Sequence, residues 1–375
     1  MELKVETRLI SSLEDFLSIE ESWNKIYLST DKKNPFLSWE WNRLWITNFG
    51  ELSSVKIVLV QEKSEILAIA PFSLTNKKIT FLSDPFFADY ADLMCTESIA
   101  FITNEIIKVI TSSLDWQVID LQTIPETSET LPYLIKALSK HTPYSETILL
   151  SYNPYITTSA NYTDYYQSRK KSLRSEMVRT RNSLDKTYKK WDFIQAKTVD
   201  EKLDIYSALV DFHLDRQNAK IGTSIFDNSM NIEFFKNLLQ NKNLPWQIDM
   251  SAVKADGKFI TASISIIDNK SFYYWIPSFD RSFSKGSIGN FHIMLLLEEC
   301  FKSNINRFDF MGGNESYKLK WSDESYKNYR ILSYKSYFTK FRADLIKNFI
   351  NILKKHKENI YLRPIWIKIS KLVGK

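Results

Sequence analysis

The chain carries one order of predicted elements twice, and this repetition limits the possible folds more than any other feature. In the first half, the pattern of apolar residues predicts strands at 55–61, 66–74 and 79–82, then a helix near 104–114 and a strand at 117–121. A helix that joins two strands of one sheet is a crossover connection, which is typical of sheets that contain parallel strands.

The second half repeats the order. Strands are predicted at 247–255, 259–267 and 271–277, followed by a helix at 291–303 and a strand at 307–310. We therefore predict an α/β fold (α+β, with mixed sheets) built as two tandem lobes with a cleft between them, and with a C-terminal helical tail. The two halves correspond in the order of their elements and not in sequence.

Length and composition fit this organisation. The 375 residues exceed one typical domain, so we predict an N-terminal lobe on the substrate side at 1–155, a second lobe at 156–340 and a tail at 341–375. No run of apolar residues reaches the length of a membrane span, and the first residues are charged. Two cysteines and four scattered histidines indicate a cytoplasmic protein without a metal site.

Positive charge is concentrated in two segments. The chain carries a net +6, yet 166–190 and 341–375 each hold nine basic and two acidic residues, a net +7, which leaves −8 for the rest. A body of that sign excludes a general DNA-binding protein. Each segment can be a solvated helix face. The basic, tryptophan-containing tail can also cap the preceding domain or lie at the inner face of an anionic membrane.

A glycine-containing loop precedes the helix predicted at 291–303. Only 8 glycines occur in the chain, and Gly286 and Gly289 stand three apart at the helix entrance. Unpaired N–H groups at such an entrance, together with the charge of Lys285, suit a pyrophosphate. The alternative is an ordinary turn capped by Ser287 or Asn290, and the glycine spacing alone favours this alternative.

A second glycine turn follows the strand predicted at 307–310. Gly312 and Gly313 end the strand, and Tyr317 and Lys318 come directly after them. In an extended segment, Lys318 and Lys320 would share one face. A lysine in this position can reach a phosphate or remain in solvent.

Several short motifs occur in a characteristic order along nearly the whole chain. They are Asn34-Pro-Phe-Leu-Ser-Trp-Glu-Trp, Asp89-Tyr90-Ala91-Asp92, Lys171-Ser-Leu-Arg174, His213-x-x-Arg216, 273–289, Phe308-Asp309-Phe310-x-Gly312-Gly313 and Tyr317-Lys318-x-x-Trp321. Their combination resembles the GNAT-like acyltransferases of the CelD-like type, which are related to the FemABX peptidyltransferases. The resemblance implies two GNAT-like lobes, of which the second binds acyl-CoA, and a role in polysaccharide or envelope synthesis.

The resemblance also implies site residues. The 284–290 loop looks like the pyrophosphate turn of the GNAT fold, which implies cofactor binding by Tyr274, Lys285, Gly286, Ser287, Ile288, Gly289 and Asn290. Lys318 matches a lysine that lies near the substrate phosphate or the reacting centre in the peptidyltransferase relatives. Two positions depart from the family pattern: Phe283 replaces an arginine or glutamine, and Gln217 replaces a tryptophan.

Acyl transfer from a thioester to an amine requires deprotonation of the amine, polarisation of the carbonyl and protonation of the departing thiolate. We assign the candidate base to Asp89 or Asp92, across the cleft, or to His213. Tyr317 is a candidate proton donor to sulfur. The competing interpretations are that the aspartates cap a turn and that the histidine is packed in the core.

The sequence thus predicts an N-acyltransferase, most simply an acetyltransferase, that acylates an amino sugar or another amine of an envelope precursor. One alternative is a peptidyltransferase that uses aminoacyl-tRNA, which is disfavoured because no long coiled-coil insertion is visible. Another is a non-catalytic scaffold in polysaccharide synthesis. Neither a serine-hydrolase elbow nor a Walker-type phosphate loop occurs.

Overall fold

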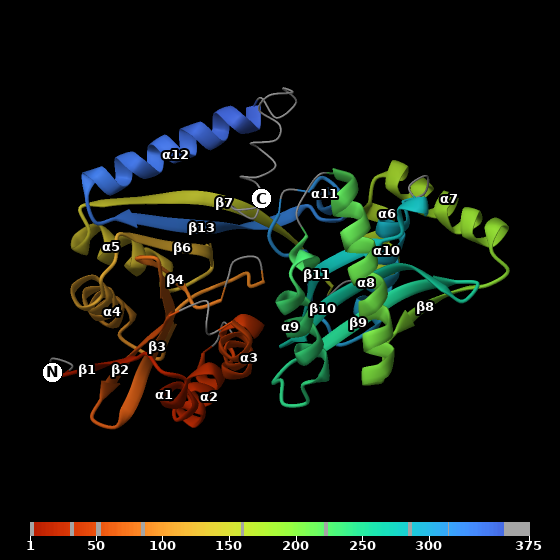
Figure 1. Cartoon of the computed structure of the whole chain (residues 1–375). Coiled ribbons are helices and arrows are strands. Elements are labelled where there is room, and N and C mark those ends of the chain that lie inside the picture. Colours follow the sequence, from red (N-terminus) through yellow and green to blue (C-terminus); the bar gives the residue numbers. More distant parts are fainter. Residues whose placement is uncertain are drawn as a thin grey trace. The chain divides into compact units, whose positions relative to one another are not determined.

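The computed structural model describes residues 4–30, 34–49, 54–83, 87–158, 161–220, 224–283, 287–313 and 315–355 (Figure 1). The chain forms two compact units. One contains the described residues up to Ser151 together with Tyr326–Lys355, and the other contains the described residues of Tyr152–Ser325.

The first unit is a mixed sheet with the strand order β1-β2-β3-β4-β6-β13. Helices α4 and α5 pack their apolar sides against it, with Ile106, Ile110 and Leu134 fully buried. Its elements are β1 (Glu6–Ile10), α1 (Leu13–Leu17), α2 (Glu20–Ser29), the 3₁₀ turn Pro35–Leu37, α3 (Trp39–Phe49), β2 (Ser54–Glu62), β3 (Glu65–Thr75), β4 (Lys78–Phe81), β5 (Met94–Cys95), α4 (Ile99–Ser113), β6 (Val118–Pro125), α5 (Leu131–His141), β13 (Glu324–Tyr334) and α12 (Tyr337–Lys355).

The second unit has the strand order β7-β12-β11-β10-β9-β8. Helices α7 and α10 cover one face of its sheet, and α8 and α9 cover the other (Figure 1). Its elements are β7 (Tyr144–Thr157), which begins in the first unit, α6 (Tyr162–Ser168), α7 (Lys171–Thr187), β8 (Trp191–Gln195), α8 (Val199–Lys220), the 3₁₀ turn Ile225–Asp227, α9 (Ser229–Gln240), β9 (Gln247–Ala255), β10 (Lys258–Asp268), β11 (Ser271–Phe279), the 3₁₀ turn Arg281–Phe283, α10 (Ile288–Lys302), β12 (Arg307–Asp309) and α11 (Lys318–Trp321).

The predicted mixed α/β fold with a repeated order of elements is confirmed. In the first unit, α4 connects β4 to β6, and these two strands pair in parallel. In the second unit, α10 connects β11 to β12, which also pair in parallel. Each unit therefore contains an antiparallel hairpin, a third strand, a crossover helix and a parallel strand.

The division between the units differs from the predicted boundaries at 155 and 340. The end of β7 pairs with β12 in the second unit, whereas β13 returns to pair with β6 in the first. Backbone hydrogen bonds to distant strands thus decide to which unit these two segments belong. The described part of the predicted tail belongs to the first unit and does not form a third one. The predicted tail residues 356–375 lie outside the described residues.

Two local predictions were wrong. The basic segment 166–190, predicted as one helix face, is divided between α6 and α7, because Arg169 and Lys170 adopt extended ψ angles of 154° and 136° between them. The segment after the Gly312-Gly313 turn, predicted as extended, forms the short helix α11. Within the described residues, every helix is too short or too polar to cross a membrane.

Candidate active site

The strands β11 and β12 separate after three residue pairs. Ser271–Tyr273 pair in parallel with Arg307–Asp309, and β11 then continues to Phe279 with β10 as its partner on the other side. Because every second residue of a strand directs its N–H and C=O groups to the same edge, β11 beyond Tyr273 presents peptide groups toward the side that β12 has left. Among the described strands, none pairs with that stretch of edge.

The chain leaves the sheet after β12 for a local reason. Met311 has a left-handed φ of 58°, and its N–H donates to the carboxylate of Asp309 at 2.8 Å. The N–H of Phe310 donates to the carbonyl of Pro154 at 2.9 Å instead of to β11. These two bonds turn the chain toward β7, and the separation of β11 from β12 follows.

The open stretch of β11 leads to the N-terminus of α10. N–H groups of the first helical turn have no acceptor within the helix, and the helix dipole is positive at this end. Ser287 precedes the helix, and its hydroxyl donates to the carboxylate of Glu176 on α7. Lys320 Nζ lies 3.1 Å from the same carboxylate and offsets its charge. The protein thus places an anionic group of its own beside this helix end.

The other predicted phosphate-binding residues have mixed environments. Ile288 is buried in the core, and Asn290 Oδ1 accepts a hydrogen bond at 3.1 Å from the indole N–H of the fully buried Trp321. A Cβ atom on Gly289 would lie 3.4 Å from the ring of Phe279, so this glycine permits a close approach of helix and strand. Lys285 and Gly286 lie outside the described residues.

Tyr274 and Tyr317 lie within electrostatic reach of one another and of Arg216. Burial raises the pKa of both phenols. Tyr317 adds to the rise for Tyr274, and Glu315 adds to it for Tyr317, whereas the Arg216 charge opposes the rise in both. Both hydroxyls are therefore protonated at neutral pH. The ring of Tyr274 packs against Phe308, at 5.8 Å between centroids.

His213 contacts residues of the neighbouring 3₁₀ turn and its cap. Its Nδ1 lies 2.7 Å from the hydroxyl of Ser224, and its ring contacts the Phe226 ring edge-on at 5.3 Å. Burial, followed by the nearby Arg216 charge, lowers the pKa of His213 to about 4, although Asp227 opposes the shift. The imidazole is therefore neutral at pH 7, and these contacts match those of a packed histidine. Its role as base stays a prediction.

This histidine gives a pH prediction. Because the pKa of His213 is about 4 in the folded protein and about 6.5 when unfolded, the unfolded chain binds the proton more readily as pH falls. The free energy of unfolding should be highest above pH ~6.5 and decrease toward pH ~4, by up to about 1.4 kcal/mol for each pKa unit. Urea unfolding at several pH values measures this, and His213→Gln should show a smaller decrease. Equal decreases in both proteins would contradict the assignment.

Lys318 is buried and fully engaged within the chain. Its Nζ donates to the carbonyl oxygens of Gly312 at 2.8 Å and Met311 at 3.4 Å, and lies 3.0 Å from the carboxylate of Glu315. Gly313 has a φ of 131°, and a Cβ there would lie 2.8 Å from this Nζ and closer still to Glu315. In this arrangement Lys318 closes the glycine turn. Its predicted contact with substrate stays a prediction.

The two candidate aspartates belong to the first unit, in the segment between β4 and β5. The carboxylate of Asp92 accepts the N–H of Leu93 at 2.8 Å and the hydroxyl of Thr130. Asp89 lies three residues earlier and is partly buried. The bonds of Asp92 fix the loop locally, as the turn-capping interpretation expects, and the predicted catalytic role of either carboxylate stays a prediction.

Glu176 is the residue at this site that the sequence interpretation missed. The sequence contained only a weak indication of its role, namely that Glu176 is one of two acidic residues in the basic segment 166–190. Glu176 and Ser287 are 111 residues apart in sequence, so no local pattern could connect them.

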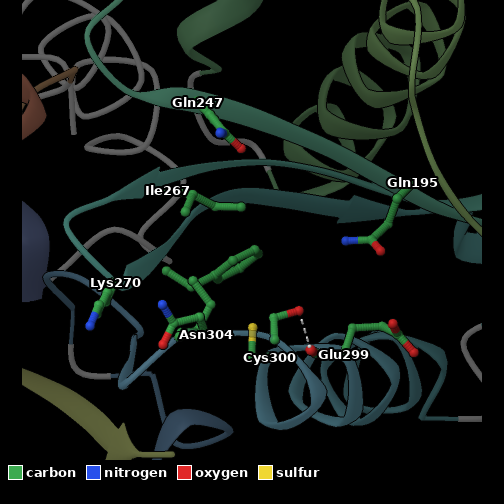
Figure 2. Close-up of a pocket in the computed structure, with 10 residues that line it drawn as sticks. Gln195, Gln247, Ile267, Lys270, Glu299, Cys300 and Asn304 are labelled. Carbon is green, nitrogen blue, oxygen red and sulfur yellow. Dashed lines mark hydrogen bonds between the residues drawn. The ribbon is translucent and has the colours of Figure 1, made fainter.

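A cavity of about 320 Å³ lies at the opposite end of α10 (Figure 2). It is lined by the last turn of the helix, including Cys300, and by Lys270 and Phe272 at the start of β11. At a rise of ~1.5 Å per residue, the helix separates this cavity from the helix N-terminus by roughly 18 Å. Cys300 is buried, and its burial raises the pKa of the thiol. This cavity is therefore distinct from the open β11 edge.

The described residues contain no group of three or more histidine, cysteine, aspartate or glutamate side chains placed to hold a metal ion. The candidate site therefore consists of a strand edge, a helix N-terminus, two protonated phenols and a guanidinium.

The match to a known protein family lies within the second unit of the chain. Residues 171–319 match the sequence family described as "Acetyltransferase (GNAT) domain". No curated protein matches the chain.

Solved structures share the fold at low sequence identity. A conserved protein of unknown function from Bacteroides thetaiotaomicron is 11% identical, with a TM-score of 0.57 over 88% of this chain and 100% of that one. FemX is 8% identical, with a TM-score of 0.56 over 88% and 95%. The C-terminal domain of a putative lysylphosphatidylglycerol synthetase from Agrobacterium fabrum is 10% identical, with a TM-score of 0.55 over 88% and 96%. Residues 171–319 therefore match a GNAT acetyltransferase domain, and the chain shares its fold with FemX.

Proposed function

We propose that the protein is an N-acyltransferase that uses acyl-CoA, most simply acetyl-CoA, and acylates an amine. The observation that carries this proposal is the unpaired edge of β11 together with the N-terminus of α10, where Gly289 approaches the ring of Phe279 at the end of β11. A strand edge offers N–H and C=O groups to a ligand that contains amides, and a helix N-terminus offers N–H groups to a phosphate. The pantetheine arm and the diphosphate of acyl-CoA occur in that order.

The chemistry assigned to the site is acyl transfer by positioning and proton transfer. The amine nitrogen attacks the thioester carbonyl, the C–S bond breaks, and the amine proton is lost while the thiolate gains one. An N–H of the β11 edge would polarise the carbonyl oxygen. The protonated hydroxyls of Tyr317 and Tyr274 are candidate donors to sulfur. Holding the amine and the thioester together removes much of the entropic barrier.

The acceptor is proposed to be an amino sugar or another amine of an envelope or polysaccharide precursor, as the motif resemblance implies. The base that accepts the amine proton is assigned to Asp89, Asp92 or His213. Of these, His213 is neutral at pH 7, and its lowered pKa of about 4 makes it a weak base.

Calorimetric titration with acetyl-CoA tests the proposal. We expect saturable binding, and we expect acetyl-pantetheine, which lacks the diphosphate, to bind at least about tenfold more weakly, because the contacts at α10 would be lost. No heat of binding at millimolar acetyl-CoA would refute an acyl-CoA-dependent enzyme. Binding of aminoacyl-tRNA in its place would support the peptidyltransferase alternative, and binding of neither would favour a scaffold.

The basic segment of α6 and α7 bears on the tRNA alternative. Two of its arginines are engaged within the chain: Arg169 Nη2 lies 2.5 Å from the carboxylate of Asp323, and Arg174 donates to Gln167. Charges so engaged are less available to phosphates. We therefore favour acyl-CoA over aminoacyl-tRNA as the acyl donor.

A further inference from the structure

Helix α12 exposes a continuous row of large apolar side chains. The row, which we call the apolar stripe, repeats at intervals of three and four residues and so follows one side of the helix. Its members are each between 46% and 67% exposed: Tyr337, Phe338, Phe341, Leu345, Phe349 and Ile352. Scattered exposed apolar residues are normal on a protein surface, but a contiguous row of this size marks an interaction site.

The helix is attached to the first unit at its N-terminal end. The hydroxyl of Ser336 caps its N-terminus by accepting the N–H of Thr339, and the Thr339 hydroxyl donates to Gln117 at 2.9 Å. The Tyr337 ring lies 6.1 Å from that of Tyr144 on β7. Figure 1 shows α12 beginning beside β7 and β13 in this unit. These contacts hold the first turn of the helix, and the stripe residues from Phe338 to Ile352 remain exposed.

The charges beside the stripe indicate what covers it. Helix α12 contains five basic residues and one acidic residue, a net +4, and the acidic residue, Asp344, is paired with Lys340 at 3.0 Å. Arg342 and Lys347 are both exposed. A second copy of the helix would bring another +4 to this surface. The segment 356–375 also carries five basic residues and one acidic residue. Like charges repel across such a contact, so neither is the favoured occupant.

We propose that α12 lies in the plane of an anionic lipid surface, with the apolar stripe inserted at the level of the headgroups and acyl chains. A helix with an apolar side and basic flanks binds such surfaces through buried apolar area and through attraction to anionic headgroups. Each basic residue near an anionic surface adds to this attraction. This proposal concerns the first unit and does not depend on the acyl-CoA site.

Vesicle co-sedimentation of the full chain tests the proposal. We expect binding to vesicles of phosphatidylcholine with phosphatidylglycerol, and at least about tenfold weaker binding to phosphatidylcholine alone. The double variant Phe341→Asp/Phe349→Asp should lower the binding to the anionic vesicles by at least about tenfold, because it removes two inserting rings and adds two negative charges. Added salt should also weaken the binding.

The matched control is Leu17→Asp/Leu28→Asp, which adds the same charge to the same unit at side chains that are 44% and 62% exposed on α1 and α2. This control should keep most of the vesicle binding. All the substituted side chains are largely exposed, so thermal unfolding should change little in either variant.

Three results would overturn the proposal. The first is unchanged vesicle binding by Phe341→Asp/Phe349→Asp, since another segment would then hold the lipid. The second is equal binding to neutral and anionic vesicles. The third is a dimer, measured by light scattering, that the double variant dissociates, since a second copy would then cover the stripe. Loss of vesicle binding with acetyl-CoA binding retained would support the lipid assignment separately from the proposed enzyme activity.

Discussion

Replacing Ser287 with glutamate is expected to weaken acetyl-CoA binding by at least about 100-fold. Ser287 immediately precedes α10, where the diphosphate is proposed to bind, and its hydroxyl already contacts the carboxylate of Glu176. A second carboxylate would double the negative charge beside the helix end. Repulsion between unit charges ~4 Å apart reaches about 4 kcal/mol at the effective dielectric of a protein surface. Calorimetric titration measures the loss.

The control is Ser287→Gln, which has nearly the same size and shape without the charge. It should retain acetyl-CoA binding within about threefold to tenfold of the unaltered protein, since the backbone N–H groups of the helix remain. Thermal unfolding identifies any variant that is merely unstable. Similar affinities of the glutamate and glutamine variants would show that no diphosphate binds at this helix end, and the proposed site on β11 and α10 would then be wrong.

Replacing Lys318 with methionine is expected to lower the free energy of unfolding of the second unit by about 2–4 kcal/mol. Methionine has a similar length but donates no hydrogen bond, so the carbonyls of Met311 and Gly312 and the carboxylate of Glu315 would lose their shared donor. Glu315 is half-exposed and can be hydrated, which keeps the cost below that of a fully buried pair. Urea unfolding monitored by fluorescence measures the change.

The matched control is Lys320→Met, the same substitution two residues along the chain. Lys320 is 43% exposed and pairs with Glu176, so its loss should cost less than about 1 kcal/mol. If Lys318→Met folds as stably as the unaltered protein but loses acyltransfer activity, the turn-closing interpretation is wrong and Lys318 contacts substrate, as the motif resemblance implies.

The order of elements could be predicted from the sequence because it depends on local patterns. Alternating apolar residues along β10 and β11, and the helical spacing of those in α4 and α10, are visible without any knowledge of distant contacts. The exchange of β7 and β13 between the units was not visible. Strand pairing joins residues more than 150 positions apart, such as Asp309 with Tyr155, and any strand can pair with several others.

Site residues could be predicted only in part for the same reason. The glycines of the 284–290 loop and the Gly312-Gly313 turn were recognisable as backbone features. The partners of the polar side chains were not. The ammonium of Lys318 turns back to carbonyls six and seven residues earlier, and Glu176 reaches Ser287 from another helix. Both contacts depend on how the elements pack.

The sequence by itself determined the elements of this protein, their repetition and the GNAT resemblance, because propensity, periodicity and motif spacing act over a few neighbouring residues. Only the tertiary structure decided where β11 loses its neighbour, which side of α12 is left uncovered and which charges pair. These features arise from contacts between segments far apart in the chain, and the free energy of such contacts depends on burial and geometry that exist only after folding.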